Sequence, residues 1–574
     1  MADGSAILDR LRQRFPDDVL ATDTYRGDAS ATVHPGRVAD IARFVKEDAA
    51  LQFDMPLDVT AVDYIGQQPR FEVVYHLYST RHHHRLRLKA RVPEDHAALP
   101  SVTPVWVGAN WLERETYDMY GIHFTGHPDL RRIYLYDEFD GHPLRKDYPK
   151  EKRQPLIGPG SRRGESVGDE HPYAVDLPAP HGKGMLGAEL MRVQLGPSHP
   201  ATHGTVRIVL DLDGETIVNA DVQIGFLHRG FEKECESGFY YQAIPYTDRL
   251  NYSSAILCNV GYCLAAEKLF DIETPPRCQF LRVMAGEMAR MADHFLCVGA
   301  TALELNAFTP FLYGLEAREL VWDLVDALCG ARVTSNYVRI GGVSADMPEG
   351  FPELVRQKLP KALDLLDDME RVLTENPIFR ARMEGVGQLP AEELIAYGVC
   401  GPLLRAAGVD LDLRRVQPYL VYDQLDFDVP LGTVGDNMDR YLVRVEEIRQ
   451  SARIIEQCLR MLPEGPVDVD DPAVRWPGKS RVYGRMEELI DQFKQVTEGC
   501  KPPPGEVYVG TESANGEIGF FLVSDGTGKP YKCRARTPSF SNTQPLARMV
   551  RGRLLADIVP TFDMINMIGG ECDR

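Results

Sequence analysis

A stretch rich in proline, glycine and charged residues, residues 151–187, interrupts the apolar periodicity of this 574-residue chain. Such a composition is typical of a linker, and the chain is long enough for two or more domains. Residues 1–150 alternate between strand-like and helix-like patterns, with a predicted hairpin at 71–78 and 85–92. We therefore expect an α+β domain at 1–150, a linker at 151–187 and a second domain at 188–574.

Helical periodicity dominates this second domain. Apolar residues recur at helical spacing between Leu442 and Leu462, with charged residues between them. Three further stretches, at about 251–270, 276–305 and 310–328, are apolar enough to pack centrally. The sequence thus predicts a mainly α domain with a helical-bundle core.

Two histidines, His199 and His203, stand four residues apart at the start of this domain, in the segment LGPSHPATHG. Their spacing matches the zinc-binding H-E-x-x-H motif, but the proline and glycine around them argue against a helix, and therefore against a zinc protease. An Asp-Gly pair between two apolar runs follows, which predicts a small β-hairpin. That hairpin would bring the histidine loop next to residues 225–230. Histidines that only satisfy backbone groups in a loop are the alternative to a functional site.

Composition argues against several function classes. The formal net charge of −20 disfavours a nucleic-acid surface, which needs clustered basic residues. No run approaches the roughly 20 apolar residues of a membrane span, and the N-terminus lacks a signal-peptide core, so we expect a cytoplasmic protein. The eleven cysteines all lie at or beyond Cys235 without a C-x-x-C pair, which argues against a disulfide framework or a metal site.

Two other patterns receive no function. The triplet His82-His83-His84 lies at the tip of the first-domain hairpin, where a solvated turn is a simpler interpretation than a metal site because no further ligands are near. The glycines of residues 158–164 mimic a phosphate-binding loop, but no strand precedes them and no G-K-[ST] follows.

Motifs along nearly the whole chain resemble one family. In the first domain they are ERETYDMYGI (113–122), GHP (126–128), LRRI (130–133) and GHPLRKD (141–147). In the second domain they are the histidine loop, HRG (228–230), PYTDRLNY (245–252) and YDQLDFDVP (422–430). The chain resembles the fused C/D subunit of proton-pumping NADH-quinone oxidoreductase, respiratory complex I. In that family the second domain is similar to the large subunit of nickel-iron hydrogenases, with helices around a former metal site that forms the inner end of a quinone cavity.

The resemblance implies a quinone-reduction site. It implies that His203 and Tyr252 donate to the two carbonyl oxygens of the quinone and that His199 also lines the cavity. Imidazole titrates near neutrality and phenol donates while staying neutral, so both side chains suit that chemistry. Glu304 stands where relatives carry an aspartate hydrogen-bonded to the catalytic histidine, and its charge would respond when His203 loses a proton. A core tyrosine and an exposed helix glutamate are the structural alternatives.

Electrons must come from a partner, because the scattered cysteines cannot furnish four convergent thiolates for an iron-sulfur cluster. The resemblance implies a small subunit whose terminal cluster lies close to Arg229 and Arg249, a ferredoxin-like subunit and the quinone-channel membrane subunit. It also implies coupling to proton translocation, with quinone as the substrate and no cluster, flavin or metal bound by this chain. The expected place is peripheral, at the cytoplasmic face of the bacterial inner membrane.

The chain departs from the family pattern in two places. Thr334 stands where many relatives carry a titratable histidine near the cluster, which predicts a cluster potential independent of pH near neutrality and favours menaquinone over ubiquinone. The C-terminal GECDR keeps the usual G-E-x-D-R, but the preceding FDMINM differs from the usual sequence. A bridging subunit without catalytic residues remains an alternative. A hydrogenase large subunit is a weaker one, because Cys572 lacks the partner thiols that such a metal site needs. The sequence leaves open whether NADH or ferredoxin supplies the electrons.

Overall fold

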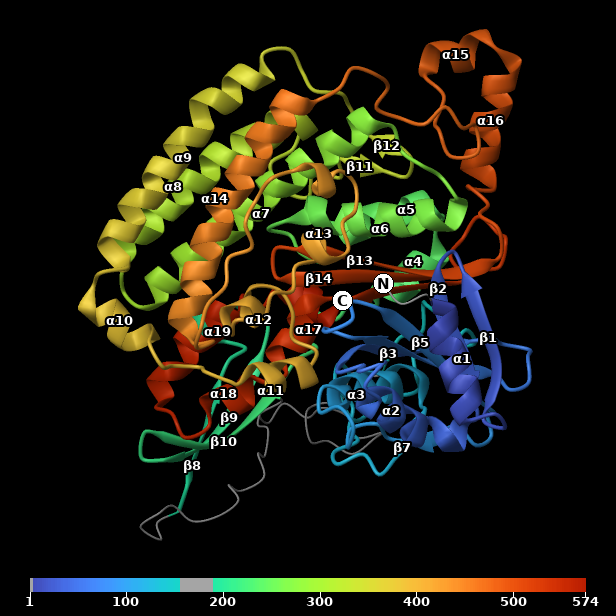
Figure 1. Cartoon of the computed structure of the whole chain (residues 1–574), viewed down its shortest axis with the longest axis horizontal. Coiled ribbons are helices and arrows are strands. Elements are labelled where there is room, and N and C mark those ends of the chain that lie inside the picture. The colour runs from blue at the N-terminus through green and yellow to red at the C-terminus, as the bar shows by residue number, and fades with distance from the viewer. Residues whose placement is uncertain (1–3, 155–188) are drawn as a thin grey trace.

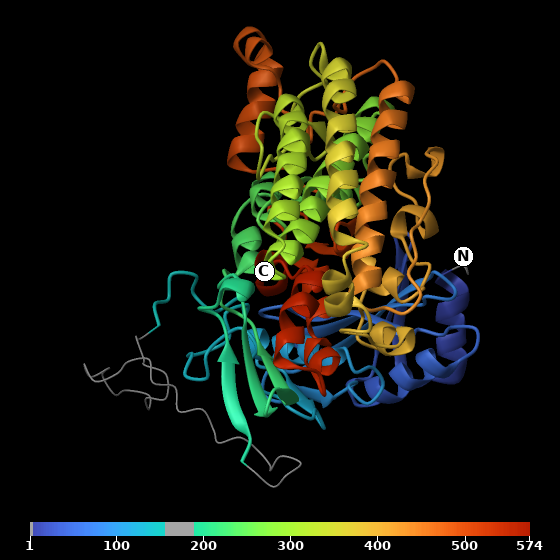
Figure 2. The ribbon, with the colours of Figure 1, turned by 90° about the vertical axis from the view of Figure 1, so that its left-hand side faces the viewer.

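A computed structural model describes residues 4–154 and 189–574. Long helices stand side by side above a β-rich base that contains the N-terminal domain (Figures 1 and 2). This arrangement confirms an N-terminal α+β unit followed by a mainly α unit. The linker predicted at 151–187 lies almost entirely outside the described residues.

The N-terminal unit is built on a five-stranded sheet with the order β1-β2-β5-β4-β3. The predicted hairpin is confirmed, since β4 and β5 pair antiparallel from Phe71↔Val92 to Tyr78↔Arg85. Its strands are β1 (Val19–Tyr25), β2 (Asp28–Val33), β3 (Met55–Asp63), β4 (Phe71–Tyr78) and β5 (Arg85–Val92), with the short pair β6 (Ala98–Pro100) and β7 (His123–Thr125). Its helices are α1 (Gly4–Arg14), η1 (Pro35–Arg37), α2 (Val38–Glu47) and α3 (Ala109–Tyr120).

The hairpin tip differs from its prediction as a solvated turn. His84 is buried, its ring stacks on His82, and its Nε2 lies 2.8 Å from the carbonyl oxygen of Leu51. The interpretation is therefore wrong for His84, because the tip folds back onto the chain around residue 51 instead of facing solvent.

Five long helices form the bundle of the second unit. They are α6 (Ala255–Phe270), α7 (Pro276–Glu304), α8 (Phe308–Cys329), α9 (Phe351–Leu373) and α14 (Asn437–Met461), which confirms the predicted helical stretches. Helix α7 lies at the centre and is buried on nearly every side. Helix α6 begins four residues later than expected, because the Asn251 side chain accepts hydrogen bonds from the backbone N–H groups of Ser253 and Ser254 and closes a turn there.

Two three-stranded sheets lie in this unit, beside the short pair β11 (Val338–Arg339) and β12 (Gly342–Val343). The predicted hairpin is confirmed as β9 (Arg207–Asp213) and β10 (Thr216–Gln223), with β8 (Met191–Leu195) added on the other side of β9. A second sheet of β13 (Gly505–Ser513), β14 (Gly516–Ser524) and β15 (Lys532–Arg536) was not predicted. It lies between the bundle and the N-terminal sheet (Figure 1), so both of its faces are covered and the usual alternation of apolar and polar residues is lost.

Shorter elements connect these layers. They are η2 (Pro200–Thr202), α4 (Phe231–Ser237), α5 (Tyr240–Thr247), β11 (Val338–Arg339), β12 (Gly342–Val343), α10 (Pro377–Met383), α11 (Ala391–Ala396), α12 (Pro402–Ala406), α13 (Leu413–Val416), η3 (Tyr422–Gln424), α15 (Lys479–Gly484), α16 (Met486–Thr497), α17 (Pro538–Thr543), α18 (Leu546–Val550), η4 (Leu555–Asp557), α19 (Ile558–Ile565) and α20 (Gly569–Asp573). Within residues 4–154 and 189–574, no helix is both long and apolar enough to cross a lipid bilayer.

A buried ionic cluster joins the two units. The Arg534 guanidinium of β15 contacts Asp58 of β3, Glu115 of α3 and Glu232 of α4, and all four side chains are buried. Lys532 pairs with Glu232, and Arg574 pairs with Glu115. Burial alone would raise the pKa of Asp58, but the charge and hydrogen bonds of Arg534, with the charges of Arg574 and Arg536, together outweigh it and leave that pKa lowered.

Candidate functional site

The C-terminal helix α20 holds together the loops that carry the predicted site residues. Asp573 accepts hydrogen bonds from the backbone N–H groups of Gly225 (3.0 Å) and Leu227 (2.7 Å). Glu571 accepts one from the Asn251 side chain at 3.1 Å, next to Tyr252. Just before α20, the Met567 sulfur lies 3.6 Å from the hydroxyl of Thr205 at the end of the histidine loop. Three motifs that are distant in sequence therefore meet at one end of the bundle.

The histidine loop is held in one conformation by its own backbone. The Nδ1 atom of His199 accepts a hydrogen bond from the Ala201 N–H, and the Thr202 hydroxyl donates to the carbonyl oxygens of Pro197 and His199. His203 follows in the left-handed region at φ 50°, with its side chain exposed. Among the described residues no side chain or backbone group pairs with the His203 ring, so that imidazole is free to meet a ligand.

Tyr252 does not behave as a core tyrosine. Its side chain is 44% exposed, and its hydroxyl has no hydrogen-bond partner among residues 4–154 and 189–574. Burial of the remainder, with the negative charges of Asp293 and Glu571, raises the pKa of Tyr252. The phenol therefore stays protonated at neutral pH and can donate.

Glu304 is the last residue of α7 and is partly buried. No hydrogen bond joins it to His203 in the part of the chain that the structure describes. Its charge acts instead on Asp563 of α19, a buried carboxyl whose Oδ2 atom lacks a hydrogen-bond partner. Burial first, and Glu304 second, raise the pKa of Asp563 well above its ordinary value.

Arg229 and Arg249 lie together at the end of α5. The Arg229 guanidinium donates to the carbonyl oxygen of Tyr246 at 2.7 Å, and that of Arg249 donates to the carbonyl oxygen of Pro245 at 2.9 Å. Burial, together with the charge of the neighbouring Arg249, lowers the pKa of Arg229. The loop that contains Thr334 reaches the same place, because the Asn336 backbone N–H bonds to the carboxylate of Asp248.

Sequence reasoning missed the buried acids behind Tyr252. Asp293 of α7 and Glu571 of α20 are 1% and 0% exposed. Asp293 stands with His294 inside the apolar stretch MADHFLCVG, and two polar residues within such a stretch are the signal that could have identified it. Glu571 belongs to GECDR, which matches the family pattern without indicating a role for the glutamate.

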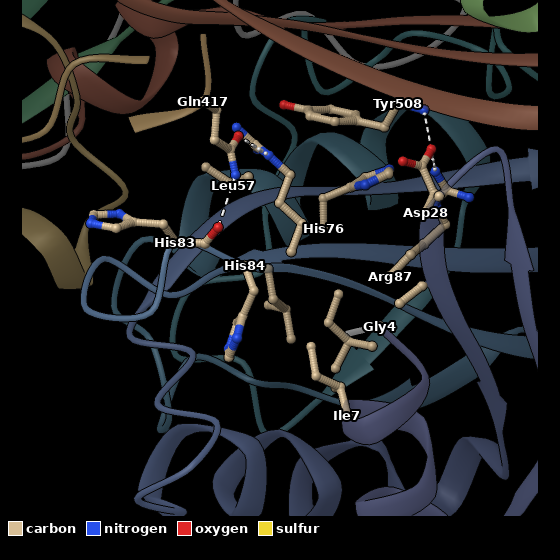
Figure 3. Close-up of a pocket in the computed structure, with 15 residues that line it drawn as sticks. Gly4, Ile7, Asp28, Leu57, His76, His83, His84, Arg87, Gln417 and Tyr508 are labelled. Atoms are coloured by element: carbon tan, nitrogen blue, oxygen red, sulfur yellow. Dashed lines mark hydrogen bonds and ion pairs between the residues drawn. The ribbon is translucent and has the colours of Figure 1, made fainter. Parts of the chain in front are cut away.

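A separate cavity of about 170 Å³ lies between the N-terminal sheet and β13 (Figure 3). His76 points upward beneath the ring of Tyr508, at a centroid distance of 4.6 Å, and Gln417 bonds to the carbonyl oxygen of His83. Burial and nearby cations lower the pKa of His76 well below its ordinary value. This cavity belongs to the junction of the two units and contains none of the predicted site residues.

The geometry defines a class of protein: an α+β unit fixed to a helical bundle, with histidine, tyrosine and arginine side chains gathered at one end. Residues 31–154 match the family described as "Respiratory-chain NADH dehydrogenase, 30 Kd subunit", and residues 304–574 match "Respiratory-chain NADH dehydrogenase, 49 Kd subunit".

Similar chains extend over the whole sequence. The C/D subunit of a NADH-quinone oxidoreductase from Bdellovibrio bacteriovorus is 44% identical over 93% of this chain and 95% of its own length. The C/D subunit from Nitrosospira multiformis is 39% identical over 100% of this chain and 97% of its own. A NADH-quinone oxidoreductase D subunit of Sorangium cellulosum is 53% identical over 68% of this chain and 96% of its own. The chain belongs to the family of fused C/D subunits of NADH-quinone oxidoreductase, and it acts as one subunit of that oxidoreductase.

Proposed function

We propose that this chain forms the protein side of a quinone-reduction site, in which His203 and Tyr252 donate hydrogen bonds and protons to the two carbonyl oxygens of the quinone. The observation that carries the proposal is the position of these two side chains. Both are exposed donors without partners among the described residues, on loops that the C-terminal residues 567–571 hold at one end of the bundle. Reduction of a quinone to a quinol consumes two electrons and two protons, so a donor at each carbonyl is what the reaction needs.

We propose, from the family resemblance, that the electrons enter from the iron-sulfur cluster of a partner subunit. Arg229 and Arg249 present two neighbouring positive charges, which would stabilise an added electron on a partner's iron-sulfur cluster. We assign His199 a supporting role, because its Nδ1 is already used to shape the histidine loop.

Exposed apolar surface supports contacts with further subunits. Helix α16 leaves Met486, Leu489, Ile490 and Phe493 exposed along one face, and a contiguous apolar face of this kind is typical of an interaction site. We propose the cluster-carrying small subunit, a ferredoxin-like subunit and the quinone-channel membrane subunit as partners. The assembly would lie at the cytoplasmic face of the inner membrane, and its quinone chemistry would drive proton translocation.

The experiment that tests the proposal is Tyr252→Phe in the assembled oxidoreductase. We expect inhibitor-sensitive quinone reduction to fall at least about tenfold, because general-acid donation contributes about that much or more. Oxidation of the electron donor by an artificial acceptor that bypasses the quinone should be unchanged. Tyr483→Phe, at a tyrosine that is 86% exposed on α15, is the matched control and should alter neither rate. If Tyr252→Phe leaves quinone reduction intact, the site assignment fails and a bridging role becomes the better interpretation.

A further inference from the structure

One amide connects two buried carboxyl groups behind Tyr252. The Nδ2 atom of Asn251 lies 2.9 Å from Oδ2 of Asp293 and 3.1 Å from Oε1 of Glu571. Asn251 is the residue immediately before Tyr252, so the bridge lies directly behind the tyrosine loop. Asp293 and Glu571 are also the two charged groups that raise the pKa of Tyr252.

Neither carboxyl group contacts a cation among the described residues. Asp293 accepts its other hydrogen bonds from Ser254 (2.8 Å) and Asn566 (2.7 Å), and Glu571 accepts one from the Ser539 hydroxyl. All of these donors are neutral.

The charged groups nearby are committed to other partners. His294, next to Asp293, directs Nε2 to Glu447 at 2.8 Å. Arg444 faces His294 and Asn515, at 3.3 and 3.2 Å. The titratable or charged groups that face the pair from the surrounding elements are Tyr252 and Cys258 around α6, His294 and Cys297 on α7, Asp563 on α19, and Cys572, Asp573 and Arg574 at the C-terminus.

Two negative charges that share one buried amide and no cation carry a prohibitive desolvation cost, and a proton removes most of it. We propose that the Glu571–Asp293 pair holds one proton at neutral pH and returns it to the Tyr252 oxygen after Tyr252 has protonated the quinone. This inference rests on the proposed quinone site. The pKa of Glu571 agrees with this inference. Burial and the charge of Asp293 raise that pKa to about 7, although the hydrogen bond from Ser539 lowers it.

The step balances in electrons and protons. The quinone takes two electrons from the partner's cluster and two protons, one from an N–H bond of His203 and one from the O–H bond of Tyr252, which leaves a tyrosinate. No hydrogen bond joins either carboxyl group to the Tyr252 hydroxyl among the described residues, so the proton of the Glu571–Asp293 pair leaves its carboxyl oxygen, crosses by way of water and forms a new O–H bond on Tyr252. The doubly ionised pair takes up a proton from solvent before the next turnover. Glu571 and Asp293 are thus positioning residues that act through Tyr252.

The test is Glu571→Gln in the assembled oxidoreductase, with quinone reduction followed against pH. In the parent enzyme we expect the rate to fall as the pH rises through about 7, the pKa of Glu571, because the pair then loses its proton. Glu571→Gln should lower the rate at pH 7 at least about tenfold and abolish the fall in rate with rising pH. Oxidation of the electron donor by an artificial acceptor that bypasses the quinone should be unchanged. Glu571→Gln should also remove a protonated-carboxyl carbonyl band from the redox-induced infrared difference spectrum. Glu353→Gln, at an exposed glutamate on α9, is the control.

Asp293→Asn provides a second variant if Glu571→Gln does not assemble. This change removes the negative charge beside Glu571, so the fall in rate with rising pH should begin at a lower pH. If the fall begins at the same pH as in the parent, the inference is overturned. A Glu571→Gln enzyme with the parental pH profile and carbonyl band overturns it too. If Tyr252→Phe still abolishes quinone reduction in those cases, the proposed function stands without the proton pair. If Tyr252→Phe has no effect, the proposed function itself has failed.

Discussion

Replacing Arg534 by methionine removes the centre of the ionic cluster between the two units. Arg534 donates five hydrogen bonds to three buried carboxylates. After the change Glu115 keeps Arg574 and Glu232 keeps Lys532, but Asp58 loses its only ion-pair partner among the described residues. One buried carboxylate is then uncompensated, and breaking a buried pair in this way costs about 3 to 5 kcal/mol. We expect Arg534→Met to lower the free energy of unfolding by that amount at pH 7, measured by urea unfolding of the purified chain.

The pH dependence of this loss identifies its cause. In the parent protein, folding lowers the pKa of Asp58. Its ion pair therefore stabilises the folded state fully at a pH above the pKa of Asp58 in the unfolded chain. This stabilisation is lost as the pH falls through the pKa of Asp58 in the folded state. The difference between variant and parent should therefore shrink below about pH 4, near the ordinary pKa of aspartate. Arg371→Met, at an exposed arginine on α9, should change stability by less than about 0.5 kcal/mol. A loss below about 1 kcal/mol at pH 7, or one that is still of equal size at about pH 2, would refute this reasoning.

Two further outcomes follow from single side chains. Asp563→Asn should stabilise the chain by about 1 to 2 kcal/mol at pH 8 and not at pH 4. Folding raises the pKa of the Asp563 carboxyl, so the ionised carboxyl destabilises the folded state increasingly as the pH rises above its pKa in the unfolded chain. Urea unfolding at the two pH values measures the gain in stability. An equal gain at both would contradict this account. Thr334→His should make the midpoint potential of the partner's cluster fall by about 60 mV per pH unit near neutrality, while the parent potential stays constant. Potentiometric titration of both enzymes checks this, and a parental slope of that size would show that another group titrates with the cluster.

Local patterns in the sequence predicted the elements whose burial follows one face. The amphipathic repeat from Leu442 to Leu462 identified α14, and the Asp-Gly pair identified the β9–β10 hairpin. The sheet β13–β15 escaped prediction because its second face is buried against the N-terminal sheet by charged residues such as Arg534. Those charges resemble a solvated surface until their partners, hundreds of residues away, are known.

The candidate site shows the same limit. Motif resemblance identified His203 and Tyr252, but local sequence carries no sign that the C-terminal residues Met567 and Glu571 contact their two loops. Asp293 and Glu571 meet only because Asn251 lies between them, across 278 residues of chain measured from residue 293 to residue 571. Pairings of this kind depend on tertiary packing, which no local pattern encodes.

Several side chains in or near the proposed site are exposed to solvent. Tyr252 is 44% exposed, and the apolar side chains of Leu227 and of Phe308, which follows Glu304 closely in the chain, are 44% and 58% exposed. Electrostatic interactions with a reacting quinone strengthen when water is excluded, and exposed side chains alone cannot exclude it. In the proposed assembly, partner subunits therefore have to exclude water from the quinone. This chain contributes donors on loops that its C-terminal segment holds in place, while enclosure and reducing power depend on the assembled complex.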